Sequence, residues 1–229
     1  MAQESITLPF ETPVPSKDRL ANGEERYPMP YEAYIDWLDE EGNHGEWVDG
    51  EVIVFEMPSF EHQDLVLWLG ILLRTYVLRL GLGVVAVAPY PMRVEQVRSS
   101  RLPDVLFVAT EHLDRRTSKR LLGPADLAVE IVSTTSGPRD HREKLAEYAT
   151  AGVSEYWIID PRLLRRSVTV YHLDDEQVYQ SIPHRPDGTL DSAVLPDLRL
   201  PAAWLLDDPL PDLVDALDVL LASSAPNDR

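Results

Sequence analysis

Apolar residues recur at helical spacing in four parts of the chain. The longest of these runs, residues 61–81, is mostly apolar and ends at Gly81, which predicts a mostly buried helix closed by a glycine. A second helix is expected to begin near Asp140 and to end just before Gly152. Shorter helices are expected within residues 27–42 and 211–221.

Short runs of β-branched and alternating residues predict strands between these helices. Residues 46–58 alternate on both sides of Asp49-Gly50, a pair typical of a two-residue hairpin turn. Residues 195–206 fit a strand or a lid that rejoins the body. The other strands are expected within residues 83–89, 91–95, 103–109, 126–133, 155–161, 167–173 and 176–182. This order favours an α/β fold, a single domain in which helices cover a mixed sheet.

The ends of the chain differ from its middle. Residues 1–29 are polar, contain prolines and show no periodicity, so we expect an extended or mobile N-terminal arm. Residues 30–206 carry the elements of the expected domain, and residues 207–229 an amphipathic helix and a polar tail. With 229 residues, 44% of them apolar, the chain can bury a substantial core.

The composition excludes several classes of site. The chain has no cysteine, so it can form neither a disulfide nor a thiolate zinc site, which is consistent with a reducing compartment. Its N-terminus lacks the basic start and apolar core of a signal peptide. The longest uninterrupted apolar stretch, residues 65–73, is too short to span a bilayer. We therefore expect a cytoplasmic protein without a membrane partner.

The net charge of −18 argues at first against nucleic acid, which binds to basic surfaces. The charge is unevenly distributed, however. Residues 93–166 contain 13 Lys and Arg against 11 Asp and Glu, whereas the rest of the chain carries a net charge of −20. The acidic residues thus lie mainly in the flanks, where a solvated surface explains them, and the middle of the chain is balanced to slightly basic.

One carboxylate stands within each of two otherwise apolar segments. Glu130 lies in DLAVEIVS, residues 126–133, and Asp104 in PDVLFVA, residues 103–109. Burial of an unpaired carboxylate is costly, so Glu130 should be paired, protonated or bound to a metal ion. If the two segments are neighbouring strands, both carboxylates can face one point, where a divalent cation would relieve their repulsion. Ligands that are all oxygens favour Mg²⁺ or Mn²⁺ over Zn²⁺.

Lys144 completes this set. In a helix it lies at the edge of the apolar face near Tyr148, from where its ammonium can reach the strand end that holds Glu130. Two acids, a cation and a lysine are the groups that phosphodiester hydrolysis needs. The metal ion neutralises charge and acidifies water, and the lysine orients the nucleophile or stabilises the charge on the phosphate.

Each of these residues also has a plainer interpretation. Asp104 could simply begin a strand, and Glu130 could pair with a buried arginine. Lys144 could be an exposed lysine that pairs with Asp140 or Tyr148. Only the ordered set, two acids on strands followed by a lysine on a helix, favours the catalytic interpretation over these.

Four parts of the sequence resemble the Uma-two family of endonucleases, which belongs to the PD-(D/E)XK restriction-endonuclease-like superfamily. They are EWVDGEVIV with the later HQ, LPDVLFVA, DLAVEIVSTTS and DHREKLAEYATAGVSEYWIIDP, and the resemblance runs from about Tyr31 to about Leu206. It implies a restriction-endonuclease-like mixed β-sheet flanked by helices and a Mg²⁺-dependent nuclease centre, with Mn²⁺ as an alternative ion. The implied substrate is nucleic acid, with DNA expected ahead of RNA.

The resemblance also implies roles for particular residues. Asp104 corresponds to the motif aspartate and Glu130 to the second acid, and with Ile131 they are the expected metal-binding residues. The superfamily lysine usually stands two residues after the second acid, where this chain has Val132. In this family the lysine has moved to the following helix, which corresponds to Lys144.

Two further residues match the family. Glu46 stands at its early acidic position, and His62 corresponds to the histidine that opens the long helix. His62 could contact a phosphate or assist a second metal ion, or it could only cap the helix or lie on the surface. The expected catalytic residues are therefore Asp104, Glu130, Lys144, Glu46 and His62.

The sequence is compatible with three functions. A metal-dependent endonuclease uses all of these residues. A non-catalytic interaction module that kept the fold would bind a protein partner through its acidic flanks, but it gives no reason to retain Asp104, Glu130 and Lys144 together. A glycoside hydrolase, which also pairs two carboxylates, leaves Lys144 without a role.

The apolar residues exceed what one small sheet obviously covers. Residues 65–73 include Trp68, and residues 213–221 read LVDALDVLL. We therefore expect a homodimer, which would also present two active centres to a duplex.

Overall fold

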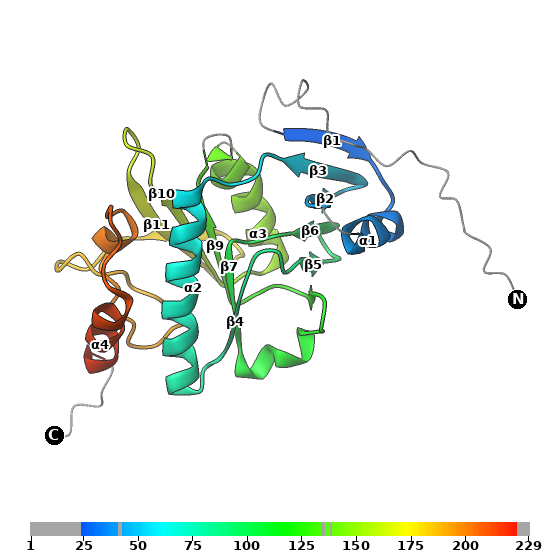
Figure 1. Ribbon diagram of the computed structural model, residues 1–229. Helices are drawn as coiled ribbons and strands as arrows, with labels where there is room; N and C mark the ends of the chain where they lie inside the picture. The colour runs from blue at the N-terminus through cyan, green and yellow to red at the C-terminus, as the bar shows by residue number, and fades with distance from the viewer. Residues whose placement is uncertain (1–23, 41–42, 134–135, 138, 224–229) are drawn as a thin grey trace, which may run out of the picture.

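The computed structural model describes residues 24–40, 43–133, 136–137 and 139–223. These residues form two six-stranded sheets with helices packed against them (Figure 1). The mixed α/β single domain with flanking helices is thus confirmed. The sequence predicted one sheet, however, and the structure has a second.

The first sheet has the strand order β12-β11-β10-β9-β7-β4. Only β9 and β10 are parallel, and they are joined through a helix, as a parallel pair requires. Each strand falls within a segment whose pattern predicted it. The bounds are Gly83–Val87 (β4), Val105–Ala109 (β7), Leu127–Ile131 (β9), Glu155–Asp160 (β10), Ser167–Leu173 (β11) and Tyr179–Ile182 (β12).

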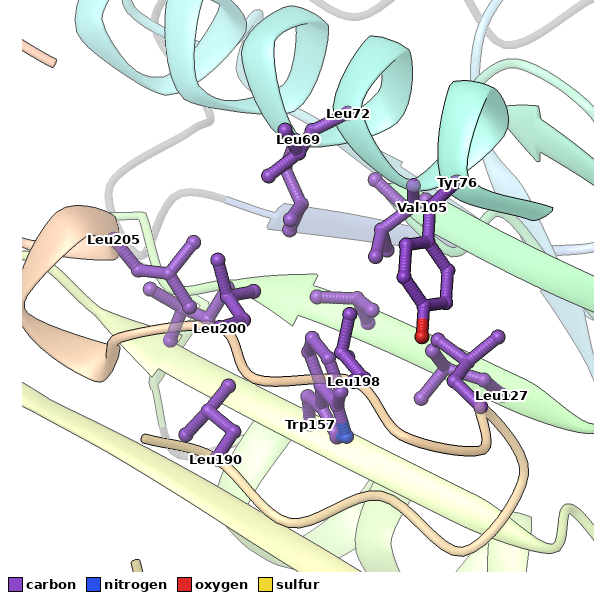
Figure 2. Close-up of a cluster of buried hydrophobic side chains, with 14 of the residues drawn as sticks. Leu69, Leu72, Tyr76, Val105, Leu127, Trp157, Leu190, Leu198, Leu200 and Leu205 are labelled. Atoms are coloured by element: carbon purple, nitrogen blue, oxygen red, sulfur yellow. The ribbon is translucent and has the colours of Figure 1, made fainter. Parts of the chain in front are cut away.

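Helix α2 (Phe60–Leu80) covers one face of this sheet, as its apolar run predicted. Ser59 caps its N-terminus by accepting a hydrogen bond from His62 N, and Gly81 ends it with a φ of 67°. Figure 2 shows the core that lies below the helix, where its side chains meet those of the sheet and of the segment that ends at Leu205. The labelled members are Leu69, Leu72, Tyr76, Val105, Leu127, Trp157, Leu190, Leu198, Leu200 and Leu205.

Helix α3 (Leu145–Ala151) packs on the opposite face of the sheet. Alternate residues of β9 explain the two faces, since Leu127 and Val129 join the α2 core and Ala128 packs with Tyr148 of α3. The segment predicted as one regular helix begins with a π-helical turn, η2 (Arg139–Lys144), before α3 starts. Such wide turns are frequent at functional sites.

The second sheet has the strand order β1-β3-β2-β6-β5-β8. The hairpin of β2 and β3 turns at Asp49-Gly50, with φ values of 48° and 94°, which confirms that prediction. Helix α1 (Tyr31–Asp39) buries Tyr34 and Trp37 against this sheet. The strand bounds are Glu24–Pro28 (β1), Glu46–Val48 (β2), Glu51–Phe55 (β3), Met92–Val94 (β5), Ser99–Arg101 (β6) and Leu121–Leu122 (β8).

Two segments differ from their predictions. Residues 24–28, placed in the N-terminal arm, form β1 and pair with β3; residues 1–23 lie outside the described part of the chain. Residues 195–206 form no regular strand. They run irregularly into a short 3-10 helix, η3 (Ala202–Leu205), and their leucines complete the main core. A second 3-10 helix, η1, spans Thr110–Arg115.

Helix α4 (Leu213–Ser223) confirms the predicted terminal helix, and the polar tail after it lies outside the described residues. The helix packs beside α2 (Figure 1). Trp68 lies at this junction, where it donates to Pro211 O at 2.9 Å and meets Trp204 edge-on. Among the described residues, no helix is long and apolar enough to cross a membrane.

Candidate active site

A cavity of about 1120 Å³ opens where the chain passes from β6 of one sheet to β7 of the other. All the residues that the sequence selected line it, although they come from both sheets, from α2 and from η2. They are Glu46, His62, Asp104, Glu130, Ile131 and Lys144. The structure therefore brings the predicted set together, while the catalytic and metal-binding roles of its members stay predictions.

Glu130 is buried in β9 and is held by two partners on its Oε1 atom. Lys144 Nζ lies 2.8 Å from this oxygen, and Tyr148 Oη donates to it at 2.8 Å. No arginine is its partner among the described residues, so the plainer interpretation through a buried arginine is not the arrangement found. Burial raises the pKa of Glu130 to about 8, although Lys144 acts in the opposite direction. The carboxyl group can therefore change charge near neutral pH.

Lys144 is the last residue of η2 and is only 3% exposed. Its ammonium lies 2.8 Å from Glu130 Oε1, 3.0 Å from Glu46 Oε1 and 3.7 Å from Asp140 Oδ1. Burial lowers the pKa of Lys144, but the three carboxylates outweigh it and raise the pKa above its usual range. Lys144 is thus a fixed positive charge inside the cavity wall rather than an exposed helix lysine.

Glu46, at the start of β2, has its carboxylate fully engaged. Oε2 accepts from Arg101 at 2.9 Å, and Oε1 accepts from Leu102 N at 3.1 Å and lies 3.0 Å from Lys144 Nζ. Burial acts to raise its pKa, but Lys144 and Arg101 prevail and hold it below its usual range. Glu46 is therefore suited to hold the Lys144 ammonium in position.

We expect Glu46→Gln to destabilise the protein by about 3–5 kcal/mol, because it leaves the buried charges of Arg101 and Lys144 undercompensated. Urea unfolding of the variant measures this. Glu143→Gln is the control: its exposed pair with Arg26 should contribute no more than about 1 kcal/mol. If Glu46→Gln loses no more unfolding free energy than Glu143→Gln does, the positioning role of Glu46 is contradicted.

Asp104, His62 and Ile131 contact one another in the lining of the same cavity. Asp104 Oδ2 accepts from Ile131 N at 2.7 Å, so the aspartate is tied to the residue after Glu130. His62 Nε2 lies 3.0 Å from Ile131 O and 3.4 Å from Asp104 Oδ2. Burial lowers the pKa of His62, but Asp104 reverses this and raises it overall. His62 is therefore part of the site and not a surface residue.

The donor atoms at this point suit a hard divalent cation. Asp104 and Glu130 offer carboxylate oxygens, and Ile131 can offer only its main-chain carbonyl. Within the described residues, no three His, Cys, Asp or Glu side chains converge tightly enough to hold a metal ion. A cation here would thus be held by two carboxylates and a carbonyl, with water completing its shell, as Mg²⁺ accepts readily.

The sequence reasoning missed two buried charges of this cluster. Arg101 is 1% exposed and joins Glu46 to Glu147, whose Oε1 accepts from its Nε at 3.0 Å. Asp140 is also 1% exposed, whereas the sequence predicted it near a helix start and as a possible partner of an exposed Lys144. Arg101 has no signal in the sequence, because SSR is typical of a polar loop. For Asp140, its place four residues before Lys144 on a helix predicts that the two can pair but not that both are buried.

The chain resembles known proteins in sequence and in fold. The Uma2 family model, described as "Putative restriction endonuclease", matches residues 31–203. A solved structure, described as "a putative nuclease belonging to DUF820 from Anabaena variabilis ATCC 29413", superposes with a TM-score of 0.62 at 17% identity, covering 78% of this chain and 98% of that one. No curated protein matches the chain. Since the family model spans most of its length, the chain belongs to the Uma2 family.

Proposed function

We propose that this protein is a metal-dependent endonuclease that hydrolyses phosphodiester bonds of nucleic acid. The family description and the structural neighbour both support a nuclease. The observation that carries the proposal is the contact of Lys144 Nζ with Glu130 Oε1 at 2.8 Å, in a cavity that also holds Asp104.

Different residues of the cavity have different roles in the proposed hydrolysis. Asp104, Glu130 and the Ile131 carbonyl would hold Mg²⁺ or Mn²⁺, which neutralises charge on the phosphate and acidifies water. The Lys144 ammonium stabilises negative charge as it develops on the reacting phosphate. Glu46 holds this ammonium in place, since its own carboxylate is already engaged with Arg101.

Arginines in the lining of the cavity support a polyanionic substrate. Three arginines line the cavity: Arg139, Arg162 and Arg166. Arg139 pairs with Glu24, and Arg162 donates to Asp160 at 2.6 Å, whereas Arg166 is exposed. Because Arg139 is buried, Arg166 and the half-buried Arg162 are the arginines that would contact phosphates beside the scissile bond, and such contacts position a strand without reading its sequence.

A cleavage assay tests the proposal. The purified chain is incubated with single- and double-stranded DNA and RNA, each with Mg²⁺, with Mn²⁺ and with a chelator. We expect internal cleavage only when a divalent ion is present, and faster cleavage of DNA than of RNA. Failure to cut any of the four substrates with either ion would overturn the proposal.

We still expect a homodimer, but for a different reason from the one that the sequence suggested. Trp68 and α4 cover one another within a single chain, so they leave less apolar surface than the sequence suggested. Helix α2 still exposes Leu67, Ile71 and Leu78, which lie along one side of it. Light scattering should give twice the mass of one chain, and a strict monomer at working concentration would contradict this.

A further inference from the structure

Asp140 carries a buried carboxylate that the roles above leave unused. The residue is 1% exposed, and neither Oδ1 nor Oδ2 has a hydrogen-bond partner within the described residues. Its ion-pair partner, Lys144 Nζ, stands 3.7 Å from Oδ1 but lies closer to Glu130 and Glu46. Buried carboxylates normally accept several hydrogen bonds, because burial deprives them of water. Among the described residues, Asp140 therefore accepts fewer hydrogen bonds than its burial calls for, although the Ser136 side chain lies near enough to lower its pKa.

The main chain fixes this position. Asp140 N donates to Ser136 O at 3.0 Å, and Tyr156 Oη donates to Asp140 O at 3.1 Å. Tyr156 is fully buried and packs edge-on against Tyr148, the residue that donates to Glu130. The main chain of Asp140 is thus held by Tyr156, which packs against the tyrosine that donates to Glu130.

Asp140 also lines the same cavity as Asp104 and Glu130. Burial raises the pKa of Asp140, and Lys144, the nearby Ser136 side chain and Arg139 act against it, whereas the Asp104 carboxylate raises it further. The Asp140 charge in turn adds to the effect of burial on Glu130. Three carboxylates therefore act on one another across this space, and Lys144 is shared among Glu130, Asp140 and Glu46.

We infer that Asp140 is a further acid of the cation site, which accepts hydrogen bonds from the hydration shell of a divalent ion held by Asp104 and Glu130. The inference rests on the proposed function, because it needs the same ion. Mg²⁺ and Mn²⁺ retain bound water in such sites, and these O–H groups are the donors that Asp140 lacks. Contact through water also fits the lack of a tight three-acid cluster among the described side chains. Asp140 is thus a positioning residue for the ion.

Calorimetric titration of the full-length chain with MnCl₂ tests this role. Asp140→Asn keeps the shape of the side chain and removes its charge. It should weaken Mn²⁺ binding by about tenfold or more, as the loss of a second-layer partner of a metal site does. The matched control is Asp126→Asn, since Asp126 is also buried but already accepts from Ala109 N at 2.7 Å and contacts His112 Nδ1 at 2.8 Å. Its Mn²⁺ affinity should equal that of the wild type.

The outcomes separate this inference from the proposed function. Wild-type Mn²⁺ affinity in folded Asp140→Asn would overturn the role of Asp140 alone, since a residue that only holds Lys144 would change stability and not ion binding. No Mn²⁺ binding by the wild-type chain would overturn both proposals. If Asp140→Asn does not fold, Asp140→Glu keeps the charge and displaces it by one methylene. It should also bind Mn²⁺ more weakly, and wild-type affinity there would overturn the inference.

Discussion

Replacing Lys144 with alanine should reduce metal-dependent cleavage by about 10²-fold or more, the usual cost of removing one preorganised group that stabilises the transition state. The ion ligands Asp104 and Glu130 remain, so Mn²⁺ affinity should change far less than the cleavage rate. Lys144→Arg should rescue poorly, because a wide planar guanidinium does not fit where a compact ammonium contacts Glu46 and Glu130. Single-turnover cleavage rates measure both variants.

The same change should also lower stability, because it leaves the ionised Glu46 carboxylate with Arg101 as its one remaining ion-pair partner among the described residues. Loss of one partner from a buried ion pair typically costs about 3–5 kcal/mol, which most domains survive. Rates should therefore be measured well below the unfolding temperature. Lys119→Ala is the matched control, since its pair with Asp39 is exposed and lies outside the cavity. Near wild-type cleavage by Lys144→Ala would show that another cation does this work.

Glu130→Gln should abolish cleavage while the protein stays folded and becomes no less stable. The substitution keeps the shape of the side chain and removes a charge whose burial is costly. Tyr148 Oη can still donate to the amide oxygen, as it donates to Oε1 of the carboxylate at 2.8 Å. Activity assays and urea unfolding at the same pH separate the two effects. Unfolding of Glu130→Gln would mean that Glu130 holds a structural ion pair.

The matched control for this variant is Glu155→Gln. Glu155 is fully buried in the neighbouring strand β10, but it accepts from Trp157 Nε1 and Ala193 N, each at 2.6 Å, and it does not line the cavity. This variant should lose stability, because one carboxylate serves two donors, and should cleave normally once folded. If both variants lose the same activity, a specific role of Glu130 in cleavage is contradicted.

The pH dependence of stability gives an independent check on Glu130. Burial raises its pKa from 4.5 to about 8, so the folded protein retains a proton that the unfolded chain releases. This contribution to stability is present below about pH 4.5 and is lost as the pH rises through about 8. Glu130→Gln should remove that part of the pH dependence, so its advantage over the wild type should grow between pH 5 and about 8.

The first sheet and its helices could be predicted because their signals are local. Helix α2 is a long, mostly apolar run between a serine cap and Gly81, and most strands of the first sheet are short runs rich in β-branched residues. The second sheet could not be predicted in full. Its strand β6 is the polar sequence SSR, and β8 has two residues, so neither shows a period. These strands form because neighbouring strands satisfy their backbone groups, and such pairing is not encoded locally.

The site was predictable only in part for the same reason. Asp104 and Glu130 stood out as single acids in apolar strands, and Lys144 as the lysine of the family pattern. Arg101 and Glu46 are 55 positions apart and meet only in the folded chain, so their contact and the burial of Arg101 have no local signal. The π-helical turn that directs Lys144 inward also has no sequence signal that distinguishes it from an ordinary first turn.

The central claim is that this charged cavity is a metal-dependent nuclease centre. Its most direct test compares Mg²⁺-dependent cleavage of DNA by the wild type, Asp104→Asn and Asp126→Asn. Asparagine can still accept the hydrogen bond that Ile131 N donates to Asp104, so the fold should be kept while one ion ligand is lost. We expect cleavage by the wild type and by Asp126→Asn, none by Asp104→Asn, and none by any of them with a chelator. Equal cleavage by all three proteins, or cleavage that persists in the chelator, would contradict it.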